Sequence, residues 1–388
     1  MKNCEQILAE NLGWVKDTFK KVDAKMSKVT LRSQNKIVDG VDENGKHKEI
    51  PANAWTSGFW GGLNYLLYNY TKNEDYLTTA RNIENLLDEG LANYDKLHHD
   101  VGFMWHLTAG VNYRLFGDKK SRTRNLYAAS YLFSRFIPSG GYIRAWNDPW
   151  KGSDVTNWTI IDCMMNIPLL YWAANETGDD RFAQVAMAHA DMSMLDHVRE
   201  DGSINHIVEH DRATGEPVCT YAGQGCAVGS SWSRGQAWGL YGFILSYIHT
   251  GEERYLDTAK KIAHYFIANV CDDWLPRLDF RAPAEPLYYD ATAGAIAACG
   301  LIEIAKAVPE HEGGIYLNAA INLLKAMETK FMDYNPDTDN MLGFGSIMYP
   351  DNNDPASVKR LTHVSIIYGD YFYTEALLKL LGEEFLPW

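Results

Sequence analysis

The segment Thr250-Gly-Glu-Glu-Arg-Tyr255, with Ala259 shortly after it, is one of four versions of a motif that recurs along the chain. The other versions begin at Thr71, Phe116 and Thr177. Each follows an aromatic run with almost no charge and precedes an amphipathic run, as expected where one helix ends and the next begins with acidic residues. The repeated unit is therefore a helical hairpin. Such hairpins bury their apolar faces only when several stack or close into a ring.

Two kinds of helix alternate along the chain. One kind is amphipathic and is predicted near 5–26, 74–92, 121–136, 179–198, 253–270 and 313–333. The other kind is apolar on nearly every side and is predicted near 57–71, 100–116, 157–176, 231–250, 288–308 and 363–382. Six enclosed helices surrounded by six half-exposed ones describe an all-α fold, an (α/α)6 barrel of six helical hairpins.

Length and charge limit the number of domains and the kind of partner. The chain has 388 residues, but no linker, charge block or change in composition marks a boundary, so we expect one domain over residues 1–388. The net charge of −14 disfavours a nucleic acid or an anionic membrane as partner, because the long-range field has the wrong sign. An anionic substrate would need a local cationic pocket.

The N-terminal sequence and the cysteines indicate the compartment. The first residues lead directly into a polar amphipathic run, without the apolar core of a signal peptide. No later run reaches the ~18 uninterrupted apolar residues of a membrane span. The six cysteines lack Cys-x-x-Cys spacing, so neither a zinc ribbon nor a disulfide framework is indicated. These features predict a cytoplasmic protein.

An insert at residues 201–226 differs in kind from the helices around it. Two β-like arms flank a glycine-containing turn near residues 211–215, which predicts a β-hairpin flap. Because the inner helices of such a barrel run parallel, their N-terminal ends meet at one mouth, and we place the flap there. On its return arm Thr220, Ala222 and Gln224 share one face by a period of two, and His206 lies on the opposing arm.

Two aspartates at this mouth are the candidate catalytic groups. Asp162 lies in a run that carries no other charge until Glu176. A carboxyl group buried without a partner tends to keep its proton near neutral pH, which is the state that a general acid needs. The alternative for Asp162 is a structural role at a helix kink near Pro168. Asp100 opens another inner helix, where an aspartate is also a common helix cap.

Other classes of function compete with an acid catalyst. His98 and His99, with His206 and His210 on the flap, suggest a metal site, but no His-Glu-x-x-His or comparable spacing is present. The sequence also lacks a phosphate loop, a dinucleotide fingerprint and a Gly-x-Ser-x-Gly elbow, so we expect no metal and no organic cofactor. A non-enzymatic helical scaffold that binds carbohydrate is the remaining alternative, but it would not need a charge in an apolar run.

Several motifs carry a family resemblance. In chain order, these motifs are His99-Asp-Val-Gly-Phe103, Ile161-Asp-Cys-Met-Met-Asn166, Gln224-Gly, Ser233-Arg-Gly-Gln-Ala-Trp238 and Ile367-Tyr-Gly-Asp-Tyr-Phe372. In this order they resemble the unsaturated glucuronyl hydrolases, a family with the six-hairpin barrel. The resemblance implies an enzyme that hydrates the C4=C5 double bond of a 4,5-unsaturated uronic acid at the non-reducing end of lyase-generated glycosaminoglycan oligosaccharides. Asp162 would then donate the proton to C4, and Asp100 would be the second essential carboxylate, as a stabiliser or a nucleophile.

The same resemblance implies a set of substrate-binding residues. The sugar site would be lined by His99, His206, Thr220, Ala222, Gln224, Arg234 and Trp238, with Trp55 and Trp146 as stacking faces. Arg234 or Gln224 would meet the uronate carboxylate, because a donor-rich group there offsets the negative field of the protein. Trp238 could instead be core, and Arg234 could cap helix ends.

One segment departs from the family pattern. In the members that favour sulphated substrates, the segment before the last helix resembles Ser-x-x-Ser-x-Lys. This chain has Asp354, Ser357 and Lys359 at the corresponding positions. Ser357 and Lys359 could contact a sulphate, but Asp354 would repel it, so a preference for sulphated disaccharides is not predicted. Two related activities stay open, namely an unsaturated rhamnogalacturonyl hydrolase acting on pectin fragments and a sugar epimerase that uses paired histidines.

Overall fold

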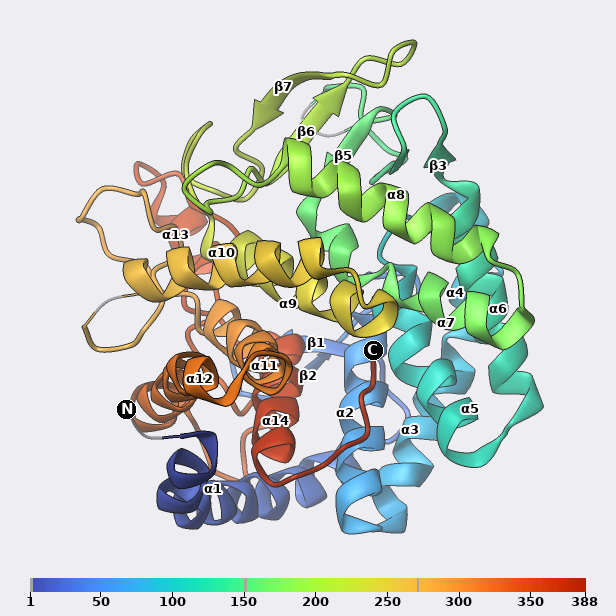
Figure 1. The fold of residues 1–388 in the computed structure, drawn as a ribbon. Helices are drawn as coiled ribbons and strands as arrows, with labels where there is room; N and C mark the ends of the chain where they lie inside the picture. Colours follow the sequence, from blue (N-terminus) through green and yellow to red (C-terminus); the bar gives the residue numbers. More distant parts are fainter. Residues whose placement is uncertain (1–2, 150–151, 271) are drawn as a thin grey trace.

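Two concentric rings of helices make up the protein. The computed structural model describes residues 3–149, 152–270 and 272–388 (Figure 1). Within that part of the chain, the inner ring consists of α2 (Ser57–Thr71), η2 (Gly102–Gly110) with α5 (Val111–Phe116), α7 (Pro168–Thr177), α9 (Ser233–Thr250), α11 (Ala291–Ala307) and α14 (Ile367–Leu380). The outer helices are α1 (Cys4–Arg32), α3 (Glu74–Leu86), α6 (Lys119–Ser134), α8 (Arg181–Asp196), α10 (Glu253–Asn269) and α12 (Glu310–Phe331). This is the predicted (α/α)6 barrel.

The recurring motif forms the turns between inner and outer helices. Gly117, Gly178 and Gly251 end three inner helices in the left-handed conformation, with φ of 70°, 70° and 73°. The following outer helices begin with polar caps in two cases, because Asn73 accepts from the N–H of Asp75 and Asp118 accepts from that of Ser121. Local sequence therefore decides where each hairpin turns.

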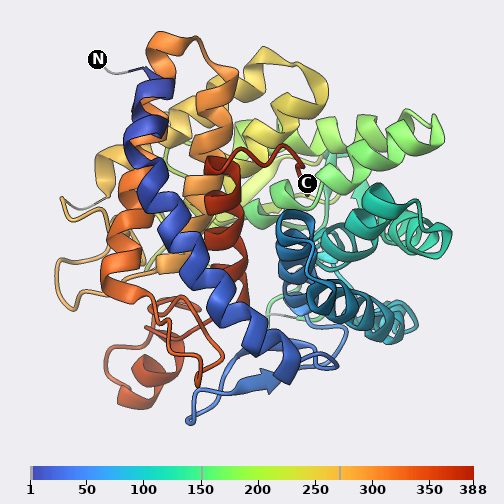
Figure 2. The same cartoon turned by 90° about the horizontal axis from the view of Figure 1, so that it is seen from below.

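The ring closes between the last and the second helices of the chain. Helix α14 packs against both α2 and α11, and α1 lies outside it, against α12 and α14 (Figure 2). The outer member of the sixth hairpin therefore comes from the opposite end of the chain, since α14 has no outer helix after it. Long-range packing thus joins the two termini into one ring.

Aromatic side chains fill the inside of the ring. Phe59, Phe103, Trp238 and Phe372 come from four inner helices and lie within 5.2–5.8 Å of one another in successive pairs of ring centroids. The C-terminal Trp388 stacks on Phe372 with an interplanar angle of 2° and is 2% exposed. Aromatic pairs in these arrangements add to the stabilisation from apolar burial, so the barrel has a packed interior below its mouth.

The prediction of an inner helix at residues 157–176 was wrong over its first half. Residues 157–176 begin as strand β5 (Trp158–Ile160), continue as the 3-10 helix η3 (Ile161–Met165) and become α-helical only at Pro168. Proline is well suited to the first turn of a helix, so Pro168 starts α7 and does not kink a longer helix. The β-branched run before it instead pairs with the flap.

The flap is a β-hairpin, as predicted, and joins a larger sheet. Strands β6 (Ile207–His210) and β7 (Pro217–Tyr221) are antiparallel, and β5 pairs with β6, which gives the order β5-β6-β7 (Figure 1). The sheet is therefore anchored on the same segment that carries Asp162.

Shorter elements complete the structure. They are β1 (Val38–Val41), β2 (His47–Glu49), α4 (Asp88–Leu91), η1 (Tyr94–Lys96), β3 (Phe136–Ile137), β4 (Tyr142–Ile143) and α13 (Pro355–Leu361). The pairs β1-β2 and β3-β4 are antiparallel hairpins that the sequence did not predict. None of the helices in the described ranges combines the length and the apolarity needed to cross a bilayer.

Candidate active site

A cavity of about 190 Å³ lies at the N-terminal ends of three inner segments, namely α2, η2 and the η3 segment that precedes α7. It is lined by Trp55, His98, His99, Asp100, Trp146, Ile160, Asp162, Gly223, Gln224 and Met348. These residues come from the start of α2, the segments before η2 and β5, η3, the end of the flap and the chain before α13. Both candidate catalytic carboxylates and both predicted stacking tryptophans therefore face the same space.

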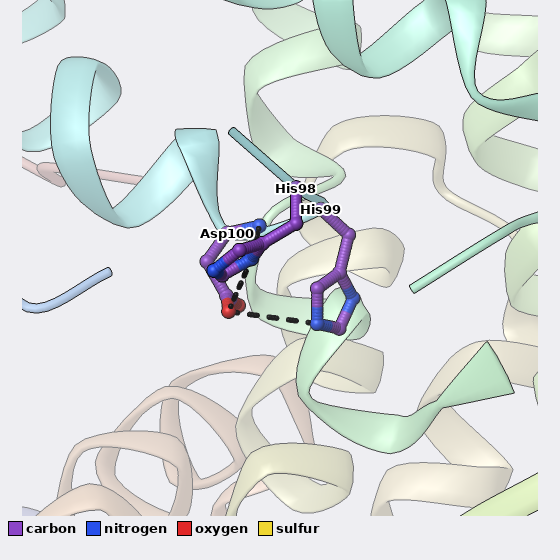
Figure 3. A group of neighbouring side chains, drawn as sticks. All are labelled: His98, His99 and Asp100. Atoms are coloured by element: carbon purple, nitrogen blue, oxygen red, sulfur yellow. Dashed lines mark hydrogen bonds and ion pairs between the residues drawn. The ribbon is translucent and has the colours of Figure 1, made fainter. Parts of the chain in front are cut away.

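Asp100 is held by its neighbours on three sides. Figure 3 shows its carboxylate in contact with both His98 and His99. Its Oδ2 lies 3.1 Å from Nδ1 of His98 and 3.5 Å from Nε2 of His99, and its Oδ1 accepts a 3.1 Å hydrogen bond from Nδ2 of Asn166. The helix that follows has no side-chain cap, so capping does not explain this aspartate. Its carboxylate belongs to the cavity.

These contacts fix the charge on this side of the cavity. Burial acts to raise the pKa of Asp100, but His99, the hydrogen bond from His98 and the one from Asn166 outweigh it and keep the pKa below its ordinary value. Burial lowers the pKa of His99 to about 4. Near neutral pH His99 is therefore uncharged, and the hydrogen bonds from His98 and Asn166 maintain Asp100 as a carboxylate.

Asp162 has a more open environment than the sequence predicted. Its side chain is 15% exposed, and its Oδ1 lies 3.6 Å from Nε2 of His206, so it is neither fully buried nor remote from another polar group. The reason is local, because η3 turns this residue toward the cavity mouth where a continuous helix would have enclosed it. Its Oδ1 nevertheless has no hydrogen-bond partner.

The flap orients His206 toward Asp162. Nδ1 of His206 accepts a 3.0 Å hydrogen bond from the backbone N–H of Gln224, which places the proton of a neutral ring on Nε2, the atom that faces Asp162. Gly223 has φ of +59°, and a Cβ there would lie 2.0 Å from Nδ1 of His206. Glycine at this position therefore allows the close approach that fixes the ring.

Asn166 is a site residue that sequence reasoning missed. Its Nδ2 donates to Oδ1 of Asp100 and, at 3.2 Å, to the backbone carbonyl of Asp162, while its Oδ1 accepts from the N–H of Phe103 at 2.9 Å. It thus joins the two segments that carry the carboxylates. The sequence did contain a signal for Asn166, because it belongs to the same motif as Asp162 and follows it by one helical turn.

Two predicted substrate-binding residues lie behind the cavity. Arg234 is 1% exposed, pairs with Asp290 at 2.5 Å and donates to the carbonyls of Ser346 and Ile347. Trp238 is fully buried against the aromatic interior. Neither lines the cavity, because Asp290 already neutralises the guanidinium and α9 directs the indole into the core. Their contacts in this structure are those of helix-end support and core packing, the two alternative roles, and contact with a substrate stays a prediction.

The flap residues divide into two groups. Gln224 lines the cavity and donates from Nε2 to the carbonyl of Ile347 at 2.7 Å. Thr220 and Ala222 are half-buried but do not line it, since β7 ends at Tyr221 and the shared face predicted for residues 220–224 is not continuous.

The segment before the last helix is not a loop at the cavity. Asp354 caps the short helix α13 by accepting from the N–H of Ala356, the hydroxyl of Ser357 accepts from the N–H of Asp351, and Lys359 is exposed. None of the three predicted residues lines the cavity, because the helix fixes two of them in backbone contacts.

The structure groups only two of the four histidines that the sequence suggested as metal ligands. His98, His99 and Asp100 have possible ligand atoms that lie within 4.8 Å of one another. His206 lies on the other side of the cavity next to Asp162, and His210 pairs with Asp196 at 3.0 Å. The two flap histidines are therefore not part of that group.

Comparisons with known proteins identify relatives of the whole chain. No family model matches the chain. It is 37% identical over 364 residues to the unsaturated glucuronyl hydrolase of Bacillus sp. strain GL1, covering 91% of this chain and 94% of the relative. It is 32% identical to the unsaturated chondroitin disaccharide hydrolase of Streptococcus pneumoniae, covering 86% and 83%. The crystal structure of the unsaturated glucuronyl hydrolase from Streptococcus agalactiae superimposes with a TM-score of 0.87 at 29% identity, covering 96% and 93%.

A barrel of paired helices, with two carboxylates and two tryptophans in a cavity at its mouth, defines a glycoside hydrolase. The extent of the similarity defines the family as well. The chain belongs to the unsaturated glucuronyl hydrolases, enzymes that act on an unsaturated uronic acid.

Proposed function

We propose that the enzyme uses Asp162 and Asp100 to hydrate the C4=C5 double bond of the 4,5-unsaturated uronic acid at the non-reducing end of glycosaminoglycan disaccharides. The main support is that the two carboxylates line one cavity and are joined through Asn166. The substrate class is supported by the Streptococcus pneumoniae relative, which is an unsaturated chondroitin disaccharide hydrolase.

The chemistry assigns a different task to each carboxylate. Asp162, when protonated, donates its proton to C4, and positive charge develops at C5 and the ring oxygen. Water then adds at C5 and gives a proton to the Asp162 carboxylate, which restores the acid. The product at C5 is a hemiketal that opens and releases the rest of the oligosaccharide. This differs from the usual scheme of two carboxylates acting at the anomeric carbon.

Asp100 stabilises the positive charge in this scheme. It keeps a negative charge near neutral pH because His98 and Asn166 donate to it. A preformed anion at a fixed position stabilises the developing cation without a reorganisation cost. We assign Asp100 to stabilisation in preference to nucleophilic attack, since donors engage both of its oxygens.

Recognition of the sugar depends on aromatic and amide groups. Trp55 and Trp146 both line the cavity and offer faces on which a sugar ring stacks. Gln224 uses one amide hydrogen on the Ile347 carbonyl, and the second is available to the uronate carboxylate. Arg234 donates to the same carbonyl and holds that segment in place behind the cavity.

Sulphate is not required for recognition in this proposal. The contacts of Asp354 and Ser357 within α13 leave Lys359 as the exposed cationic member of the trio, outside the cavity. We expect unsulphated disaccharides to be hydrolysed at least as fast as sulphated ones.

We further propose that residues 1–388 act as one catalytic domain in the cytoplasm. One apolar cluster extends from Ile7 to Trp388, which supports the single domain. The thiols of Cys163 and Cys299 are free and buried, which fits a reducing compartment.

The test is an assay of unsaturated disaccharides from chondroitin, hyaluronan, heparin and pectin digests. Hydration removes the ultraviolet absorbance of the conjugated double bond, so each reaction is followed directly. We expect the glycosaminoglycan products to be consumed, and consumption of the pectin product alone would favour the rhamnogalacturonyl activity. If none is consumed, the proposal is wrong.

A further inference from the structure

A groove continues from the active site along one side of the barrel mouth. A cavity of about 220 Å³ shares His98 and Trp146 with the active site. It shares Asp95, Asn147 and Asp148 with a third cavity of about 520 Å³, which is much larger than the active site. Shared walls make these three cavities successive parts of one groove.

The groove is tied rigidly to the active site. Nδ2 of Asn147 donates to the carbonyl of Leu97 at 2.7 Å, and the N–H of His99 donates to the carbonyl of Ala145 at 3.2 Å. The segment that forms the far wall therefore packs on the residues immediately before Asp100. A ligand bound at the far end has a fixed relation to the catalytic centre.

Two arginines form the floor of the far cavity. Neither Arg135 nor Arg144 has an ion pair with any carboxylate of the described chain, although the protein carries a net charge of −14. Arg135 is 4% exposed and donates to the carbonyls of Arg144 and Ala145 and to Asn147. Arg144 is half-buried, and the only hydrogen bond of its side chain within the described ranges runs from Nη2 to Oδ1 of Asn147 at 3.0 Å. Its other donors are available to a ligand.

Acidic groups are confined to the rim. Asp148 pairs with Lys96 at 3.3 Å, and both side chains are more than half exposed, so this pair exchanges partners easily. Asp95, which is also exposed, is the other acid that lines the two cavities outside the active site. The floor is therefore cationic, and the buried surroundings of Arg135 reduce solvent screening of an anion bound beside it.

Exposed tyrosines flank this floor. Tyr94 is 63% exposed and lies edge-on to Tyr131, with ring centroids 4.9 Å apart. Tyr127 is 64% exposed and lines an adjoining cavity of about 340 Å³ that shares Tyr94 and Tyr131 with the far one. Large aromatic faces open to solvent beside a cationic floor suit a sugar ring that carries an anionic group.

We propose that the far cavity is a distal subsite that binds an anionic sugar of substrates longer than a disaccharide. Arg144 contacts the carboxylate or sulphate group, and Tyr94 stacks on the ring. This inference rests on the proposed function, because it assumes that an unsaturated end occupies the active site while the chain continues along the groove. The enzyme then prefers longer lyase products.

The kinetic test compares a disaccharide with a hexasaccharide from the same chondroitin digest. Arg144→Gln and Tyr94→Ala should raise KM for the hexasaccharide about tenfold while changing disaccharide kinetics by less than about twofold. The matched control is Arg181→Gln. Arg181 is an exposed arginine at the start of the outer helix α8, and it pairs with Asp179. Equal effects on both substrates, or no effect on the hexasaccharide, would overturn the subsite.

A binding test separates this inference from the proposed function. Calorimetry with saturated hexasaccharides measures the groove without turnover, and Arg144→Gln should weaken binding about tenfold. Hyaluronan fragments carry carboxylates alone and chondroitin sulphate fragments carry both anions, so the two series show which anion Arg144 contacts. If wild type binds neither, the subsite is wrong even when disaccharides are hydrolysed. If binding occurs but no unsaturated product is consumed, only the proposed function fails.

Discussion

Asp100 and Asp162 face one cavity from walls that are built differently. Asp100 lies between His98 and His99 and accepts from Asn166, so both of its oxygens are engaged. Asp162 has one neighbour of this kind, Nε2 of His206 at 3.6 Å, and its Oδ1 has no hydrogen bond. A carboxylate surrounded by donors keeps its charge, and the donors in this site surround Asp100. This difference in surroundings supports the proposed roles of the two aspartates, a fixed charge at Asp100 and an acid at Asp162.

The largest expected effect comes from removing the exchangeable proton. Asp162→Asn should lower kcat by about 1,000-fold or more with little change in KM, because the contribution of a positioned acid is about 10²–10⁴-fold. Loss of ultraviolet absorbance measures the rate, and circular dichroism checks the fold. Asp75→Asn, at an exposed position on α3, is the control. Activity above a few per cent of wild type would remove Asp162 from the acid role.

Removing the fixed charge should have a smaller effect. Asp100→Asn should lower kcat by about 100-fold, because the lost electrostatic stabilisation resembles that of one oxyanion-hole group. The ionisations in the pH profile of the residual kcat/KM should stay where they are in wild type, because the lowered pKa of Asp100 keeps it a carboxylate near neutral pH. If they move or disappear, the two aspartates titrate as a pair and the assigned roles are wrong.

Asn166 tests the connection between the two walls. Asn166→Asp would place a second carboxyl group about 3 Å from Oδ1 of Asp100, and like charges at this distance raise the pKa of the pair. We expect activity to fall about tenfold at pH 7 and to recover at lower pH, where the new group is protonated and donates as the amide did. Asn166→Ala loses the donor without adding charge, so its pH profile should keep the wild-type shape. Identical profiles for the two variants would show that charge is not the cause.

The fold could be predicted because its determinants are local. Glycines and acidic residues of the repeated motif lie at the helix ends themselves, and the uniformly apolar runs are the enclosed helices. The exception is β5, whose partner β6 lies more than 40 residues further along the chain. β-branched residues allow either structure in an apolar run, so tertiary pairing decides.

The site could be predicted only as a set of motifs. The quoted motifs contain Asp100 and Asp162, which line the cavity, and also Arg234 and Trp238, which lie behind it. A motif does not distinguish a residue that contacts a ligand from one that supports it. The environment of Asp162 was also unpredictable, because His206 reaches it through a strand pairing and a glycine turn on a distant segment.

The pH response of His99 should be small and confined to acid. Burial lowers its pKa to about 4, and the charge of Asp100 acts in the opposite direction, so Asp100→Asn should lower it further. An unfolded chain binds this proton near pH 6.5, so the contribution of the neutral ring to stability is lost as pH falls from about 6.5 toward 4. Nuclear magnetic resonance of the ring should show no titration between pH 5 and 8 in either protein. A titration in that range would mean that the charge beside Asp100 changes near neutral pH, which contradicts a fixed charge on this side of the cavity.

Chelation should have the smallest effect, and its result tests the comparison between Asp100 and Asp162 most directly. His98, His99 and Asp100 have possible ligand atoms within 4.8 Å of one another, so a metal ion bound among them is the alternative to a carboxylate held by hydrogen-bond donors. We expect EDTA to change kcat/KM by less than about twofold, since proton transfer by Asp162 needs no Lewis acid. Loss of activity that zinc or magnesium restores would make Asp100 a metal ligand. Its donors would then orient a metal centre, and the division between a fixed charge and an exchangeable proton would no longer hold.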